Sequence, residues 1–194
     1  MKSRKHIPML MLLALLSCAG KAGAQTVGVK SDLLTGSMLA SPNLGVELKL
    51  SERFTLEAGF HYNPFPAGGD RRWKHWFVQP ELRYWMCQPY GGHFFGANLM
   101  YGVYNVAKAR LPFGLFKGIR SERYEGDFTG VGISYGYHFI LSPRWGLETS
   151  IGVGFLHTGY ERYRCSHCGE RTGSGNRNLV APTKAAISIV YMIK

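Results

Sequence analysis

The stretch Gly130-Val131-Gly132-Ile133-Ser134-Tyr135-Gly136-Tyr137-His138-Phe139 decides the fold, because large apolar residues alternate with small or polar ones at every second position. Successive side chains of a β-strand point to opposite faces, whereas an amphipathic helix repeats its apolar residues every three or four positions. Residues 131–139 therefore predict a strand with one apolar face. The chain also contains 25 glycines, which disfavour a helical fold.

The same alternation recurs along the chain and predicts eight strands. The other seven are residues 27–34, 44–50, 54–62, 76–84, 95–103, 147–155 and 185–193. Short turns at 51–53, 88–92 and 142–144 alternate with long connections at 63–74, 107–123 and 161–178. An even number of strands of about 9 to 11 residues, with long connections on one side only, is typical of bacterial outer-membrane proteins. We expect residues 25–194 to form one domain, an all-β, eight-stranded antiparallel up-and-down transmembrane β-barrel.

A soluble lipocalin-like barrel is the alternative fold, with the apolar face turned inward. Its other face should then be rich in Lys, Glu, Thr and Asn, whereas here that face is mostly glycine with scattered charges. Small residues are what a narrow eight-stranded lumen requires. Aromatic residues near strand ends also favour a membrane location, where they line the interface: Tyr62, Trp76, Tyr84, Tyr137, Trp145 and Tyr191.

The N-terminus has the features of a secretory signal peptide. Lys2, Arg4 and Lys5 precede an apolar run at 9–16 that is too short to span a membrane, and Ala22 and Ala24 fit the small-residue cleavage rule. We expect residues 1–24 to be removed after export through the inner membrane of a Gram-negative cell. Lipidation at Cys18 is the alternative, because residues 15–18 loosely resemble a lipobox.

The mature chain stays basic, since the leader contains four basic residues and no acidic one and its removal lowers the formal net charge from +11 to +7. An exported basic protein meets phosphate mainly in lipid head groups and surface glycans. We therefore expect outer-membrane lipid and lipopolysaccharide as partners, and no nucleic acid.

Charged residues on the non-apolar face predict a network inside the barrel. They are Lys30, Asp32, Glu47, Lys49, Glu57, Glu81, Arg83, Glu148 and Lys184. Charges in a narrow lumen must pair, because an unpaired buried charge costs several kcal/mol. We expect the four glutamates to pair with Lys49, Arg83 and Lys184 as a structural plug. A proton or ion pathway is the alternative.

Basic residues dominate the long connections and suggest contacts with lipopolysaccharide phosphates, for which the arginine fork is suited. The candidates are Arg71, Arg72, Lys74, Arg120, Arg123, Arg162 and Arg164. Ordinary solvated loop charge is the alternative.

The Cys165-Ser166-His167-Cys168 segment lies in the last long connection. Outside the cell such a pair favours a disulfide over half of a zinc site. Cys87 is expected at the opposite end of the barrel. We expect no metal and no other cofactor.

The histidines are the candidate catalytic residues, because some eight-stranded barrels act on lipid A through a histidine and a serine at the outer rim. His61 and His75 flank the connection that contains Asp70, and His157 lies near the outer end of its strand. Spacing places no serine beside them, so we predict no catalytic residue.

Five segments carry a resemblance to a known family: residues 43–47 (NLGVE), 74–85 (KHWFVQPELRYW), 92–96 (GHFFG), 132–137 (GISYGY) and 182–188 (PTKAAIS). In these segments the chain resembles the Bacteroidota family named as domain of unknown function 3575, signal-bearing proteins regarded as outer-membrane barrels. The resemblance implies no reaction and no catalytic residue. It also implies genes that can lie near those of surface-fimbria components.

The sequence as a whole predicts a non-enzymatic outer-membrane barrel that supports the envelope or presents its surface to a partner, such as a fimbrial or other surface protein. A narrow transport or channel barrel and a lipid A-modifying outer-membrane enzyme are the alternatives.

Overall fold

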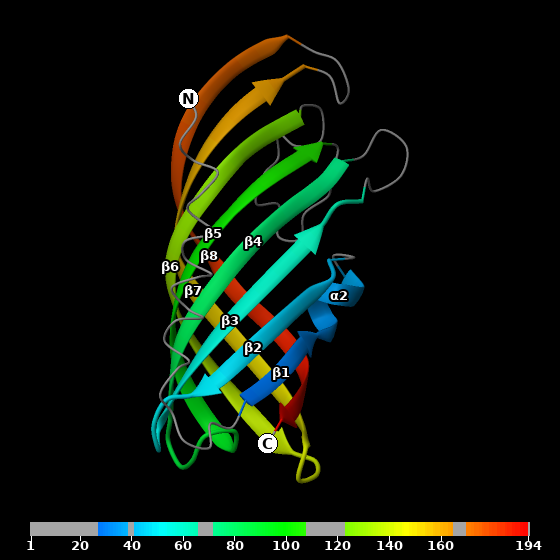
Figure 1. Cartoon of the computed structure of the whole chain (residues 1–194). Coiled ribbons are helices and arrows are strands. Elements are labelled where there is room, and N and C mark those ends of the chain that lie inside the picture. Colours follow the sequence, from blue (N-terminus) through cyan, green and yellow to red (C-terminus); the bar gives the residue numbers. More distant parts are fainter. Residues whose placement is uncertain (1–26, 39–40, 66–71, 108–122, 165–169, 194) are drawn as a thin grey trace.

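Eight antiparallel strands form a closed barrel in the computed structural model, which describes residues 27–38, 41–65, 72–107, 123–164 and 170–193 (Figure 1). Each strand pairs with the next one in sequence, and the last pairs back with the first. The elements are β1 (Val27–Asp32), α2 (Leu33–Met38), β2 (Asn43–Lys49), β3 (Phe54–Asn63), β4 (Arg72–Trp85), β5 (Gly92–Ala107), β6 (Arg123–Ile140), β7 (Trp145–Tyr163) and β8 (Arg171–Ile193). This confirms the predicted eight-stranded up-and-down topology.

Strand length increases around the barrel, from 6 residues in β1 to 23 in β8. The additional residues of β4 to β8 lie at the end of the long connections, where these strands rise above the rest of the wall (Figure 1). We call residues 72–75, 104–107, 123–130, 156–163 and 171–179 the extension. The predicted loop at 161–178 is therefore wrong over most of its length, because β7 continues to Tyr163 and β8 begins at Arg171.

The two faces of the barrel wall differ sharply in polarity. Large apolar side chains point outward and are exposed, with Ile133 at 68% and Phe155 at 67% of their full accessibility. Charged side chains point inward, and Glu47 and Arg83 are 0% exposed. This polarity is the reverse of that of a soluble barrel, which buries its apolar face.

Glycines occupy inward positions where long side chains fill the lumen. A Cβ at Gly96 would lie 2.7 Å from Cδ of Glu81, and a Cβ at Gly136 would lie 2.6 Å from Cε1 of Phe94. Real side chains do not approach this closely. The glycine-rich face thus makes room for the few large inward residues.

The seam between β1 and β8 is closed partly by side chains. Pairing of β8 with β1 covers only residues 188–193 of β8. Just beyond it, Asp32 Oδ1 accepts hydrogen bonds from the backbone N–H of Ile187 (3.0 Å) and of Leu34 (2.9 Å), while Oδ2 accepts from the N–H of Thr35 (3.1 Å). Asp32 is therefore the N-cap of α2 and bridges the seam. It was expected in the lumen charge network, but its carboxylate makes no ion pair within the described residues.

The α2 segment is the one short helix of the described residues, and no helix among them is long and apolar enough to cross a membrane.

Candidate functional site

Seven of the predicted charged residues meet inside the barrel: Lys30, Glu47, Glu57, Glu81, Arg83, Glu148 and Lys184. They come from six strands and converge because alternate residues on every strand point inward. We call this set the lumen network.

Arg83 is the centre of the lumen network. Its guanidinium contacts four carboxylates, those of Glu47 (2.9 Å), Glu81 (2.7 Å), Glu148 (2.8 Å) and Glu57. A planar guanidinium with five N–H donors can satisfy several carboxylates at once, which a lysine cannot. The fully buried Arg83 side chain therefore links strands β2, β3, β4 and β7 across the barrel.

Two lysines complete the network from opposite sides of the seam. Lys30 on β1 lies 2.7 Å from Glu47 and 3.2 Å from Glu148. Lys184 on β8 lies 2.9 Å from Glu57 and 3.1 Å from Glu81. Both lysines thereby pair the seam strands with β2, β3, β4 and β7.

Four carboxylates face three basic side chains, so the lumen network has a formal charge of −1 when His138 is neutral. The Nδ1 atom of His138 lies 3.7 Å from Glu148 Oε2 and has no hydrogen-bond partner among the described residues. His138 therefore lies at the edge of the lumen network, beside Glu148.

Lys49 was expected in this network but makes no ion pair within the described part of the chain. It points inward at the end of β2, where it is half-buried beside the turn to β3. Lys30 takes the place that the sequence assigned to Lys49.

An aromatic floor closes the barrel below the lumen network, at the end of the short turns. Trp85 and Phe94 are fully buried, and Tyr90 is 8% exposed. The Trp85 indole donates to Thr55 Oγ1 (2.9 Å), and Arg83 lies 4.3 Å from the centre of the Phe94 ring. Alternation from Glu81 and Arg83 along β4 would have placed Trp85 inward, which is the signal that sequence reasoning overlooked.

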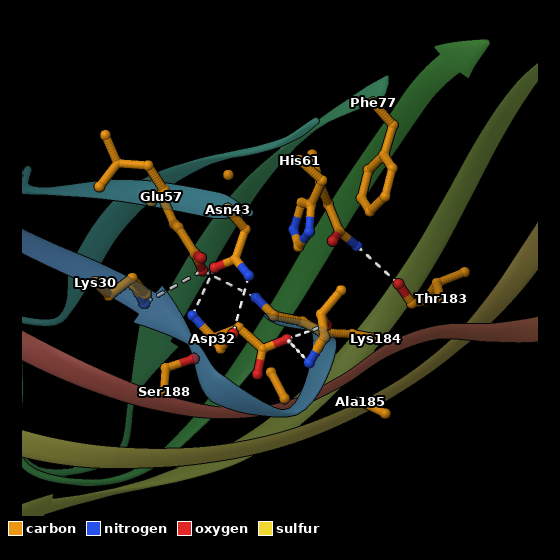
Figure 2. A pocket seen from close by; sticks show the side chains of 16 residues that line it. Lys30, Asp32, Asn43, Glu57, His61, Phe77, Thr183, Lys184, Ala185 and Ser188 are labelled. Carbon is orange, nitrogen blue, oxygen red and sulfur yellow. Dashed lines mark hydrogen bonds and ion pairs between the residues drawn. The ribbon is translucent and has the colours of Figure 1, made fainter. Parts of the chain in front are cut away.

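A cavity of about 80 Å³ lies on the other side of the lumen network (Figure 2). Lys30, Glu57 and Lys184 line it from the network, and His61, stacked on Phe77 at 4.1 Å, lines it from the wall. Gln79 closes its roof by donating to the carbonyl of Thr183 across the lumen (3.1 Å). The cavity has room for a few waters, since a single water needs about 10 to 15 Å³ of such volume.

The described members of the predicted phosphate-binding set differ in their surroundings. Arg71 and Arg120 lie outside the described residues, and of Arg72 only the backbone is described. Lys74 and Arg164 are exposed. Arg123 pairs with Glu125 (3.2 Å), and Arg162 lies on the inward face of β7 beside Gly173.

The signal peptide, Cys18, Asp70, Cys165 and Cys168 also lie outside the described residues, while Cys87 is a free, exposed thiol.

The structure pairs His75 with a serine that spacing did not reveal. Ser41 Oγ lies 3.0 Å from Nε2 of His75. Ser41 is 0% exposed, neither residue lines the cavity, and the backbone of Trp73 is the other polar partner of the His75 ring. We interpret this pair as a tie between the segment before β2 and β4.

His157 is separate from the other histidines. Its side chain points outward on β7 and its Nδ1 lies 2.6 Å from Asn178 Oδ1. Within the described residues, no group of three or more His, Cys, Asp or Glu side chains could hold a metal ion.

One protein-family model matches nearly the whole chain. The family described as "Protein of unknown function (DUF3575)" matches residues 9–193. The chain belongs to this DUF3575 family. No curated protein and no solved structure matches the chain.

The DUF3575 match covers every strand and every member of the lumen network. The family description assigns no reaction, ligand or partner. The function of this DUF3575 chain must therefore be argued from its own surface and lumen.

Proposed function

We propose that this DUF3575 protein is a non-enzymatic outer-membrane β-barrel with a closed lumen, which supports the envelope or presents its extension to a surface partner. The reversed polarity of the wall carries the proposal. An apolar exterior around a charged interior is stable in lipid and unfavourable in water.

The dimensions of the apolar exterior agree with a bilayer. On β7 the outward positions from Trp145 to Phe155 hold no Asp, Glu, Lys or Arg. These ten steps of about 3.4 Å, at a tilt of about 40°, span about 26 Å, close to the apolar band of about 25 Å expected of such barrels. We call this band the belt.

Aromatic residues at both limits of the belt support the same placement. Trp145 and Tyr191 pack together at one end, and Trp76 and Tyr101 pack at the other. Trp and Tyr prefer the membrane–water interface because their rings are amphipathic.

Connection length supports an orientation. The described turns at 50–53, 86–91 and 141–144 lie at one end of the barrel, and the extension lies at the other. Outer-membrane barrels place short turns in the periplasm and long connections outside. In the proposed orientation the extension faces the cell exterior, after removal of the signal peptide 1–24.

The lumen network and the aromatic floor favour a closed barrel over a channel. Arg83, Glu47, Glu81 and Glu148 are each at most 1% exposed. Side chains fill the interior of an eight-stranded barrel. Conductance would require breaking several buried ion pairs together, so transport is the weaker proposal.

Lipopolysaccharide and a surface protein, such as a fimbrial component, are the proposed partners of the exposed end. Lys74 and Arg164 are exposed there and are available for phosphate contacts. Replacing Arg71, Arg72 and Lys74 together by alanine should weaken binding of lipopolysaccharide and flatten its salt dependence, because fewer phosphate contacts are screened. Equal binding by the variant and the parent at every salt concentration would mean that these charges are only solvated.

Membrane placement is tested by cell fractionation and by gel electrophoresis of unheated and heated samples. We expect the protein in the outer-membrane fraction and a heat-dependent change in mobility. A protein that stays soluble without detergent and shows no such change would rule out the proposal.

The closed lumen and the lack of catalysis need two further measurements. We expect no steady conductance in planar bilayers and no change in the lipid A mass spectrum on overexpression. Stable single-channel currents would favour the transport alternative, and a new lipid A species that disappears in the His75→Ala variant would favour an enzyme.

A further inference from the structure

A groove of about 1030 Å³ lies on the extension, at the limit of the belt. Most of its lining residues point outward on the five strands β4 to β8, so it opens away from the lumen network. Gly126, Gly159 and Gly175 lie on its floor. We call it the outer groove.

One side of the outer groove is an aromatic shelf. Trp76 and Tyr101 meet edge to face, with ring centres 5.8 Å apart and planes at 70°, and Val103 lies beside them. The shelf offers apolar ring surface next to polar groups, the usual composition of a small-ligand site.

The other side of the outer groove is lined by hydrogen-bonding groups, several of which lack a partner. The carboxylate of Asp127 and the amide of Asn176 make no side-chain hydrogen bond or ion pair with other described residues. The Oδ1 atom of Asn105 is buried without a partner, although its amide donates to Glu125 (2.6 Å). A buried polar atom without a partner, such as this oxygen, is rare and often awaits a ligand or water, whereas the half-buried Asp127 and the exposed Asn176 are accessible to a ligand from solvent.

The charges of the outer groove disfavour an anion as its ligand. Glu125, Asp127 and Glu161 all line it. Arg123 pairs with Glu125 (3.2 Å) and Arg171 pairs with Glu161 (3.0 Å), which leaves Asp127 as the one carboxylate of the three without a basic partner. A phosphate would meet repulsion from Asp127, whereas hydroxyl groups would donate to it.

A sugar ring fits this combination, because it offers hydroxyl donors at its edge and an apolar C–H face to an aromatic ring. The position of the outer groove indicates where that sugar would come from. Gly159 on its floor lies four residues beyond Phe155, the last apolar residue of the belt on β7. That spacing corresponds to about 13 Å along the strand and about 10 Å above the belt, outside the hydrocarbon of the membrane.

We propose that the outer groove binds the saccharide part of outer-leaflet lipopolysaccharide. The assignment of this source rests on the proposed outer-membrane location, whereas the saccharide specificity rests on the groove itself. Asp127 and Asn105 bind hydroxyl groups, and Trp76 packs against the sugar face.

Binding is measured by tryptophan fluorescence and by calorimetry on the full mature protein in detergent. Three probes separate the ligand chemistries: lipopolysaccharide with its core sugars, lipid A, and core oligosaccharide released from lipid A. We expect the first and third to bind and lipid A to bind at least about tenfold more weakly. Equal affinity for lipid A and intact lipopolysaccharide would overturn the proposal, because it would mean recognition of phosphate or acyl chains.

Variants locate the site. Asp127→Asn and Trp76→Ala should each weaken binding of the released oligosaccharide by about tenfold or more, as expected for loss of one charged hydrogen bond or one aromatic contact. Glu52→Gln and Trp145→Ala are matched controls, since both residues are exposed at the opposite end of the barrel and should leave binding unchanged. Unaltered binding by both groove variants would overturn the assignment.

The same samples distinguish the two proposals. A heat-modifiable outer-membrane protein that binds none of the sugar probes would refute the outer groove and leave the proposed function standing. A soluble protein without heat modification that still binds the released oligosaccharide would refute the membrane location and retain the saccharide site.

Discussion

Replacing Arg83 by methionine should destabilise the protein more than any other single change in the lumen. Methionine keeps much of the length of the side chain and removes the charge and all its N–H donors. The formal charge of the lumen network then falls from −1 to −2, with four carboxylates facing only Lys30 and Lys184. Glu47, Glu81 and Glu148 remain buried after the loss of their common partner.

The expected loss is about 3 to 5 kcal/mol in the free energy of unfolding, the range for removing one partner of a buried ion pair. The double variant Arg83→Met/Glu148→Gln removes one negative charge as well and returns the network to −1. It should recover part of the loss, because one carboxylate no longer has to be compensated.

The assay is reversible urea unfolding in lipid vesicles, followed by tryptophan fluorescence. Trp85 reports on the region, since it contacts Phe94 within the aromatic floor. Arg53→Met is the control, because Arg53 is exposed in the β2–β3 turn and loss of its hydrogen bond to Tyr84 (3.1 Å) in solvent should hardly change the free energy of unfolding. Parental stability of Arg83→Met, or a double variant less stable than the single one, would refute the account of the lumen network as a structural plug.

Three further changes test the barrel itself. Gly136→Ala should cost about 1 to 3 kcal/mol in thermal or urea unfolding, because its Cβ would press on Phe94. Gly36→Ala, whose Cβ would have no neighbour nearer than 3.8 Å and which lies in α2, should not destabilise the protein. Asp32→Ala should cost about 1 to 3 kcal/mol and speed hydrogen exchange at the Ile187 amide, which loses its acceptor; unchanged exchange there would contradict the seam role. Deleting residues 185–194 removes the whole part of β8 that pairs with β1 and should abolish membrane insertion, so normal surface levels of the truncated protein would contradict the closure argument.

The sequence predicts the strands well within the belt and poorly beyond it. Inside the belt, outward residues are apolar and inward ones are small or charged, so the period of two is visible, as in residues 131–139. In the β8 part of the extension both faces are polar or glycine, and Arg171-Thr172-Gly173-Ser174-Gly175 carries no apolar alternation although it lies in a strand. A segment with two wetted faces gives no periodic signal, which explains why 161–178 was predicted as a loop.

The lumen network was predictable in membership and less so in pairing. The charged residues that point inward can be identified from the sequence, because the direction of a side chain depends only on the alternation along its own strand. Which lysine meets which glutamate depends on the shear of the barrel, which brings Lys30 on β1 beside Glu148 on β7. Asp32 shows a further limit of the sequence pattern. It stands at an inward position of its strand, but its carboxylate oxygens accept hydrogen bonds from backbone N–H groups of α2 and β8.

The outer groove was not predictable from the sequence, because its residues lie on five different strands and are brought together only by the pairing register of those strands. Asp127 and Gly159 are direct partners, yet nothing in the spacing of 32 positions indicates it. The outer groove and the lumen network also lie at different levels of the wall and share no residue. Changes at Asp127 should therefore alter ligand binding without affecting assembly. Changes at Arg83 should affect assembly and stability without altering the ligand-binding groove. This separation is what a barrel needs if the belt anchors it and the extension performs recognition, because surface residues can then change without loss of the fold.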